Sequence, residues 1–218
     1  MSNRLILHIE PSSDGSNPLF QAFQTYWQAT LSTSTGPTTA QSYRPHTTVT
    51  GYWQPQPGSP PPHEASTIIS QILQKTADNV DPNTSSAYHS ALRVGPPIPF
   101  ADGSGLVLPL QPPNSLLTFV TEISISLSAI YATSLRPKTI NHMSLAYFSY
   151  ENAGDRKMSA PELAEFAALS EQFVVPVWNG RQEEWGWDLV LLEQTVPSPA
   201  VGVPHGWLEH GRWRITKP

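Results

Sequence analysis

Two short stretches of the sequence, Pro45-His46-Thr47-Thr48-Val49 and Asn141-His142-Met143-Ser144-Leu145, follow one pattern, His-x-(Ser/Thr)-x. Both are set in β-branched or apolar surroundings that favour a strand. Because side chains alternate along a strand, His46 and Thr48 share one face, and His142 and Ser144 share another. The histidines are 96 residues apart (142 minus 46). Only the tertiary fold can bring them together, and two strands meeting in a cleft would do so.

The segments around the two motifs predict a mixed α+β protein. Asn17 and Pro18 are typical of an N-cap and a first helical residue, Asn114 can cap a second helix, and Ser159 with Glu162 forms a capping-box pattern. Apolar spacing predicts helices over 18–31, 65–77, 114–131 and 160–173, and strands over 5–9, 46–53, 88–94, 106–110, 140–148, 185–193 and 207–215.

In each half of the chain a long helix precedes a strand that begins with histidine, although no strong sequence repeat is present. This order is expected of a duplicated α+β lobe. We therefore predict one bilobal domain over residues 1–218. Two pseudo-symmetric antiparallel sheets should flank a central cleft, with the helices packed outside. The proline-rich segment 54–62 is expected to be a loop, either an insertion or a lid over the cleft.

Composition limits the class of protein. Hydrophobic residues make up 39% of the chain and charged residues 13%, which fits a folded globular protein. The net charge of −5 gives no general attraction to nucleic acid or to an acidic membrane, so a small substrate is favoured over a long polymer. The chain has no cysteine, which excludes disulfides and thiolate chemistry. With neither a signal peptide nor an apolar span in the sequence, we expect a cytoplasmic or nuclear protein, monomeric and not membrane-bound.

The paired motifs suit in-line displacement at phosphorus. One group must take a proton from the attacking water, and another must give a proton to the departing oxygen. Histidine can do either near neutral pH. The hydroxyls of Thr48 and Ser144 can donate hydrogen bonds to the phosphate oxygens, so no metal or other cofactor is required. The motifs do not assign the roles. Our preferred assignment is that His142 activates water and His46 protonates the leaving oxygen.

At these residues the sequence resembles the two-histidine phosphoesterase superfamily. The contexts Arg44-Pro45-His46-Thr47-Thr48-Val49-Thr50-Gly51 and Asn141-His142-Met143-Ser144-Leu145-Ala146-Tyr147 look most like the cyclic phosphodiesterases of plants and yeasts. The resemblance implies a role in RNA metabolism, the opening of 2′,3′-cyclic nucleotides to 2′-phosphates and the cleavage of ADP-ribose 1″,2″-cyclic phosphate. It also implies that His46, Thr48, His142 and Ser144 are catalytic or phosphate-binding and that Tyr147 contacts the substrate.

Several aromatic and basic side chains are further candidates for substrate contact. Tyr147 would lie on the wrong face of an ideal strand, so a bulge or the strand end must turn it toward His142. Tyr52 and Trp53 follow the first motif and could contact a base, although packing is the commoner role. Core packing is also favoured for the tryptophans of the last fifth of the chain. Arg136 and Lys138 could attract phosphate or belong to a solvated loop.

Three other hypotheses stay open. A related enzyme could act on linear 2′,5′-linked or RNA-terminal bonds, or ligate RNA ends. A binding module could keep the phosphate cleft without catalysis. The motifs could also be accidental in a structural protein. The spacing of His205 and His210 does not favour a metal site in a strand, and we expect His8, His63 and His89 to be structural or exposed.

Overall fold

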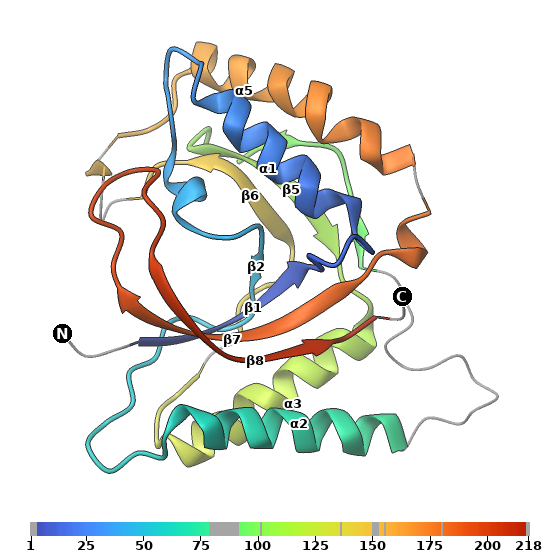
Figure 1. Ribbon diagram of the computed structural model, residues 1–218, viewed down its shortest axis with the longest axis vertical. Helices are drawn as coiled ribbons and strands as arrows, with labels where there is room; N and C mark the ends of the chain where they lie inside the picture. The colour runs from blue at the N-terminus through green and yellow to red at the C-terminus, as the bar shows by residue number, and fades with distance from the viewer. Residues whose placement is uncertain are drawn as a thin grey trace.

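The computed structural model describes residues 4–78, 92–100, 102–135, 137–149, 153–154, 156–179 and 181–216. Its strands form two antiparallel sheets of four strands each. Helices α2 (Pro62–Asp78) and α3 (Asn114–Ile130) lie on the far side of the first sheet from the second sheet. Helices α1 (Pro18–Thr30) and α5 (Ala160–Phe173) cover the second sheet (Figure 1). This is the predicted α+β arrangement of two lobes with the helices outside.

The first sheet has the strand order β2-β1-β7-β8, with β2 (Thr47–Thr48), β1 (Arg4–Pro11), β7 (Trp187–Val196) and β8 (Gly206–Arg214). Its central strands are buried on both faces. Leu5, Leu7 and Ile9 join the main apolar core, which runs through both lobes. On the opposite face, Ile6 lies in a small second cluster with Val190. The alternation of β1 therefore places His8 and Glu10 on the face that carries Ile6.

The second sheet is built around β5 (Gly105–Gln111). Strands β3 (Arg93–Val94) and β4 (Ile98–Pro99) pair along one edge of β5, and β6 (His142–Tyr147) pairs along the other. The second motif is thus on a strand beside β5, as the first motif is beside β1. The register is irregular, because Val107 lies opposite Ser144 and Leu106 lies opposite Ala146. Leu145 is therefore an extra residue, which makes a β-bulge in β6.

Local sequence signals set the starts of α1 and α5 where the sequence indicated, whereas α2 begins at Pro62 and not at the predicted Ala65. The Asn17 side chain accepts a hydrogen bond from the Leu19 N–H at 3.0 Å, and α1 begins with proline. Ser159 and Glu162 form the reciprocal capping box of α5. At α3 the prediction was wrong by one residue, because Asn114 is the first helical residue and Pro113 stands at the cap position. Three 3₁₀ segments, at 39–42, 175–179 and 182–184, were not predicted from the sequence.

The strand predicted over 46–53 is regular only at Thr47 and Thr48. Beyond these residues the amides of Val49 and Thr50 both donate to the Leu7 carbonyl, and the Leu7 amide bonds to the Thr50 hydroxyl at 3.2 Å. This doubled contact interrupts the ladder, so the segment continues by isolated bridges. The short strand β4 was also missed. The first part of the strand predicted over 88–94, as well as His89 and Arg136, lies outside the described residues.

A network of ion pairs covers the same face of the first sheet as His8. The Glu10 side chain is only 2% exposed and pairs with Arg212 at 2.8 Å and with Arg44 at 3.7 Å. Arg212 also reaches Asp188 at 3.2 Å. Burial raises the pKa of Glu10, and the hydrogen bond and charge of Arg212 oppose that rise. The buried carboxylate of Glu10 therefore depends on its arginine partners.

Replacement of Arg212 should destabilise the protein strongly, because it leaves the buried carboxylate of Glu10 without its nearest cation. We expect Arg212→Ala to lower the free energy of unfolding in urea by about 3 kcal/mol. The matched control is Arg181→Ala, which removes an exposed ion pair with Glu184 and should cost less than about 1 kcal/mol. Equal losses in the two variants would show that the network adds no more than a surface pair.

Candidate active site

The two motifs are brought together by backbone pairing between the lobes. Thr50 forms an antiparallel bridge with Pro137, and the Lys138 N–H donates to the Val49 carbonyl at 2.8 Å. The chain that leaves the first motif thus pairs with the chain that leads into the second. This pairing places β2 beside β6, although 96 residues separate their histidines.

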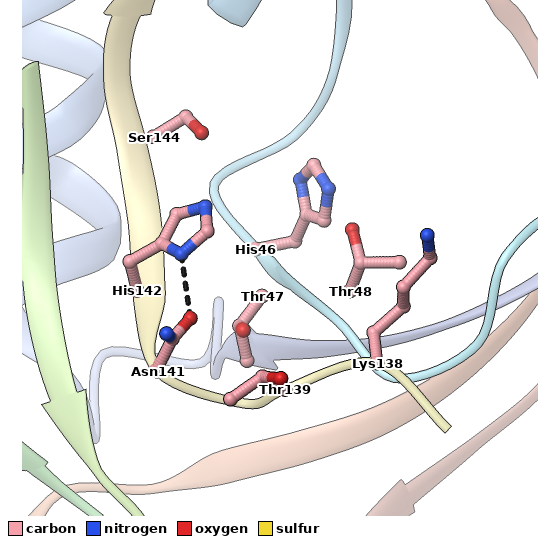
Figure 2. A pocket seen from close by; sticks show the side chains of 8 residues that line it. All are labelled: His46, Thr47, Thr48, Lys138, Thr139, Asn141, His142 and Ser144. Carbon is pink, nitrogen blue, oxygen red and sulfur yellow. Dashed lines mark hydrogen bonds between the residues drawn. The ribbon is translucent and has the colours of Figure 1, made fainter. Parts of the chain in front are cut away.

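A pocket of about 440 Å³ opens between the two motif strands. Figure 2 shows His46 and His142 on opposite walls, with Thr48 and Ser144 further along their own segments. Such a volume falls within the range of roughly 300 to 1,000 Å³ that is usual for small-molecule sites. The lining residues are His46, Thr47, Thr48, Lys138, Thr139, Asn141, His142 and Ser144. All four residues that the sequence proposed as catalytic therefore line one pocket.

His46 is held on two sides. Its Nδ1 lies 2.8 Å from the Arg44 carbonyl oxygen, which can only accept, so Nδ1 carries the proton and Nε2 is left for a substrate. The His8 ring stacks on the His46 ring with 3.8 Å between centroids, and the Tyr43 ring lies 5.3 Å away. The pKa of His46 is lowered to about 4. Burial is the main cause, the bond to the Arg44 carbonyl opposes it, and the charge of a protonated His142 adds to it. His46 is therefore neutral at pH 7 without a ligand.

His142 is held in a similar way from the other lobe. Its Nδ1 lies 2.7 Å from Asn141 Oδ1, and this bond is drawn in Figure 2. The Phe100 ring meets the His142 ring edge-on at 5.3 Å. Burial lowers the pKa of His142 as well. Both histidines thus keep Nδ1 on an oxygen and present Nε2 as the free nitrogen.

Hydroxyl and ammonium groups complete the pocket. Thr48 and Ser144 supply one hydroxyl from each lobe, and the Lys138 side chain extends past Thr48 in Figure 2. Among the described residues that line the pocket, Lys138 is the only permanently charged side chain. The position of Lys138 is thus compatible with the first of its two predicted roles, the attraction of a phosphate.

The predicted substrate contact of Tyr147 is supported only in part. Tyr147 does share a face with His142 and Ser144, because the bulge at Leu145 restores the alternation: their partners on β5 are Gly105, Pro109 and Val107. Tyr147 is nevertheless not among the lining residues, and its contact with a substrate stays a prediction.

Trp53 has the packing role, whereas a substrate contact of Tyr52 stays a prediction. Trp53 is 4% exposed and packs on Tyr131, so it belongs to the core. Tyr52 lies against Arg4 and Trp207 and is not a lining residue. The doubled contact at Leu7 shifts the pairing of the segment, so Trp53 pairs with Leu5 and joins the same apolar core.

Other aromatic and histidine residues mostly have the packing roles that were favoured. Trp185 and Trp187 are buried, and His210 pairs with Glu193 at 2.6 Å. His205 accepts a hydrogen bond from the Ser198 N–H at 2.7 Å. Within the described ranges, no group of three or more histidine, cysteine, aspartate and glutamate side chains is placed to hold a metal ion. No helix in that part of the chain is long and apolar enough to cross a membrane.

Sequence reasoning missed two rings, His8 and Phe100, that contact the histidines of the motifs. His8 had a possible signal, since a lone histidine inside the apolar run of 5–9 breaks its pattern. Phe100 follows a proline-rich segment and had none. Asn141 was quoted within the second motif, but nothing in the sequence indicated that its side chain would accept from His142.

Comparison with solved structures gives several matches. Two of them are crystal structures of E. coli LigT, a two-histidine phosphoesterase, one complexed with phosphate and one in the apo form. The phosphate complex is 11% identical and matches with a TM-score of 0.45 over 99% of each chain. The apo form is 13% identical, with a TM-score of 0.45 over 100% of this chain and 99% of LigT. No family model and no curated protein matches the sequence. We base the function proposed below on the site itself.

The buried histidines should make the protein less stable in mild acid. The folded-state pKa of His46 is about 4 and that of His8 is well below its ordinary value, so the unfolded chain binds more protons below about pH 6.5. Stability should therefore fall as the pH is lowered from 7.5 to 5.5, as measured by urea unfolding. His8→Phe should reduce this slope, because one of the two groups is gone. An unchanged slope in His8→Phe would contradict the burial of a neutral His8.

Proposed function

We propose that this protein hydrolyses a small cyclic phosphodiester without a metal, using His46 and His142 as an acid-base pair. The substrate is a 2′,3′-cyclic nucleotide, opened to the 2′-phosphate, or ADP-ribose 1″,2″-cyclic phosphate. One observation carries the proposal: a single pocket holds two histidines, each with Nδ1 bonded to an oxygen and Nε2 free, and each motif adds a hydroxyl. Such an arrangement supplies a base, an acid and hydrogen-bond donors around one phosphorus atom.

His142 is the base and His46 the acid in this proposal. His142 takes a proton from the attacking water on Nε2 as the water oxygen bonds to phosphorus. The P–O bond to the ribose oxygen breaks on the opposite side, and that oxygen takes a proton from Nε2 of His46. An anionic phosphate between the rings raises the pKa of both histidines, so His46 gains its second proton when the substrate binds. Burial makes the resulting imidazolium a strong acid.

The charge of the pocket matches a phosphodiester. A diester carries one negative charge, and Lys138 offers one permanent positive charge beside Thr48. The hydroxyls of Thr48 and Ser144 then donate to the non-bridging oxygens, where charge increases in the transition state. With a net charge of −5, the chain has no general attraction for a long polyanion, which supports a small substrate over a long RNA.

The first test is phosphorus NMR of 2′,3′-cyclic AMP incubated with the protein in EDTA. We expect the wild type to produce 2′-AMP, and His46→Ala and His142→Ala each to be slower by about 10² to 10⁴-fold, since a positioned acid or base contributes that much. His63→Ala, the same change at an exposed histidine of α2, is the control and should match the wild type. Wild-type activity in either motif variant would remove that histidine from the mechanism. Product from a linear 2′,5′-linked substrate alone would favour the RNA-end hypothesis.

A second test separates the acid from the base. A phosphodiester of a nucleoside with 4-nitrophenol has a leaving oxygen that needs no proton. On this substrate the loss caused by His46→Ala should shrink by at least about tenfold relative to its loss on the cyclic nucleotide, whereas His142→Ala should remain impaired. Release of 4-nitrophenolate gives the rate directly. Recovery of His142→Ala instead would reverse the two roles.

A further inference from the structure

His8 lies directly behind the first motif and has no part in the chemistry described above. On β1 it is opposite Thr48, so His46 is its diagonal neighbour on the adjoining strand, within reach of an aromatic ring. The two imidazoles are nearly parallel, with 3.8 Å between centroids and 20° between planes. One face of the His46 ring is thus covered by a second flat ring.

The buried His8 side chain lowers the stability of the fold at this position. It is 1% exposed, and neither ring nitrogen has a hydrogen-bond partner among the described residues. A buried polar group left unpaired costs about 1 to 3 kcal/mol. Its cross-strand neighbour Val190 is apolar, and an apolar side chain would fill the same space without this cost. A histidine ring at this site therefore calls for a functional explanation, since packing alone does not account for it.

The charges around His8 keep its ring neutral. His46 and Arg44 face it from the motif segment, Glu10 follows on its own strand, and Arg212 and Glu209 lie on β8. Glu10 is already engaged by Arg212 and Arg44, so its charge is compensated. Burial first, then repulsion from His46 in its protonated form and from the permanent charge of Arg44, hold the pKa of His8 well below its ordinary value. His8 therefore presents an uncharged flat surface to His46 over the working range of pH.

We infer that His8 is a positioning residue: its ring is the wall against which His46 lies, and with the Arg44 carbonyl it fixes the plane and the tautomer of His46 and keeps water from one face. The carbonyl fixes Nδ1, but a single hydrogen bond allows the ring to turn about it. The stack removes that freedom. Nε2 is then directed into the pocket before a substrate arrives, which is the preorganisation that proton transfer needs.

The test is a set of variants at position 8, read by NMR of nitrogen-15-labelled histidine. In the wild type, His46 should show the Nδ1–H tautomer and a low pKa. His8→Phe keeps a flat ring and should leave both unchanged. His8→Ala lets water reach the exposed face, so the pKa of His46 should rise toward about 6.5 and both tautomers should be populated. His8→Leu keeps apolar volume without a flat ring, and should show the same changes in smaller degree if His8→Ala does not fold.

A kinetic measurement on the same variants rests on the proposed function. With the cyclic nucleotide, His8→Ala should lower kcat by about 10²-fold and change KM by less than about twofold, and His8→Phe should restore kcat. In a His46→Ala background, His8→Ala should cause no further loss, because His8 acts through His46. His63→Ala is again the matched control.

The NMR and kinetic experiments distinguish failure of this inference from failure of the proposed function. An unchanged tautomer and titration of His46 in His8→Ala overturns the inference, whatever the activity. Loss of the tautomer in His8→Phe as well overturns it too, because the imidazole nitrogens and not the flat ring would then be required. If NMR shows the expected order of variants and no phosphodiester is hydrolysed, the proposed function is wrong and the inference stands.

Discussion

The short backbone pairing between the lobes is the constraint on which the site depends. The Lys138 N–H donates to the Val49 carbonyl, and Thr50 bridges to Pro137, immediately after one motif and immediately before the other. Neither sheet alone contains both histidines, so the pocket exists only where this pairing joins them. One apolar core runs through both lobes and packs them together at this junction. Because the pairing uses main-chain groups, it specifies no side chain, and the motif residues are free to serve chemistry.

The surroundings of His46 combine two different kinds of support. On one side, Arg44 is held by Glu10 and by Glu209 at 3.0 Å, and its carbonyl receives Nδ1 of His46. On the other side, His8 covers the ring with a neutral surface. The ion pairs thus stabilise the segment that carries the motif, while the stack excludes water from the histidine itself. His142 is held more simply, by the amide of its neighbour Asn141. This asymmetry accompanies the large fall in the pKa of His46, to about 4.

Local patterns in the sequence predicted the helices and the pairing of the motifs well, because caps and strand alternation act over a few residues. Ser159 with Glu162 and Asn17 before Pro18 are examples. The failures arose from long-range contacts. Nothing near Thr50 shows that Leu7 will bond to it twice and shift the pairing, so that Trp53 lies opposite Leu5. The need for a bulge before Tyr147 could be deduced from the alternation, but its position at Leu145 is set by the partner strand. The stack of His8 on His46 likewise requires the register of β1.

The charge balance of the pocket also bears on turnover. In the proposed reaction a cyclic diester brings one negative charge into a pocket lined by the ammonium of Lys138. Hydrolysis makes a monoester whose second ionisation has a pKa of about 6, so the product gains most of a second charge at neutral pH. No second permanent cation is present among the described lining residues to balance it. Once His46 has given up its proton, the burial that lowers its pKa opposes its return. In the proposed step His142 gains a proton from water while His46 loses one, so one imidazolium still faces the product. Loss of that proton to solvent would then weaken the hold on the product.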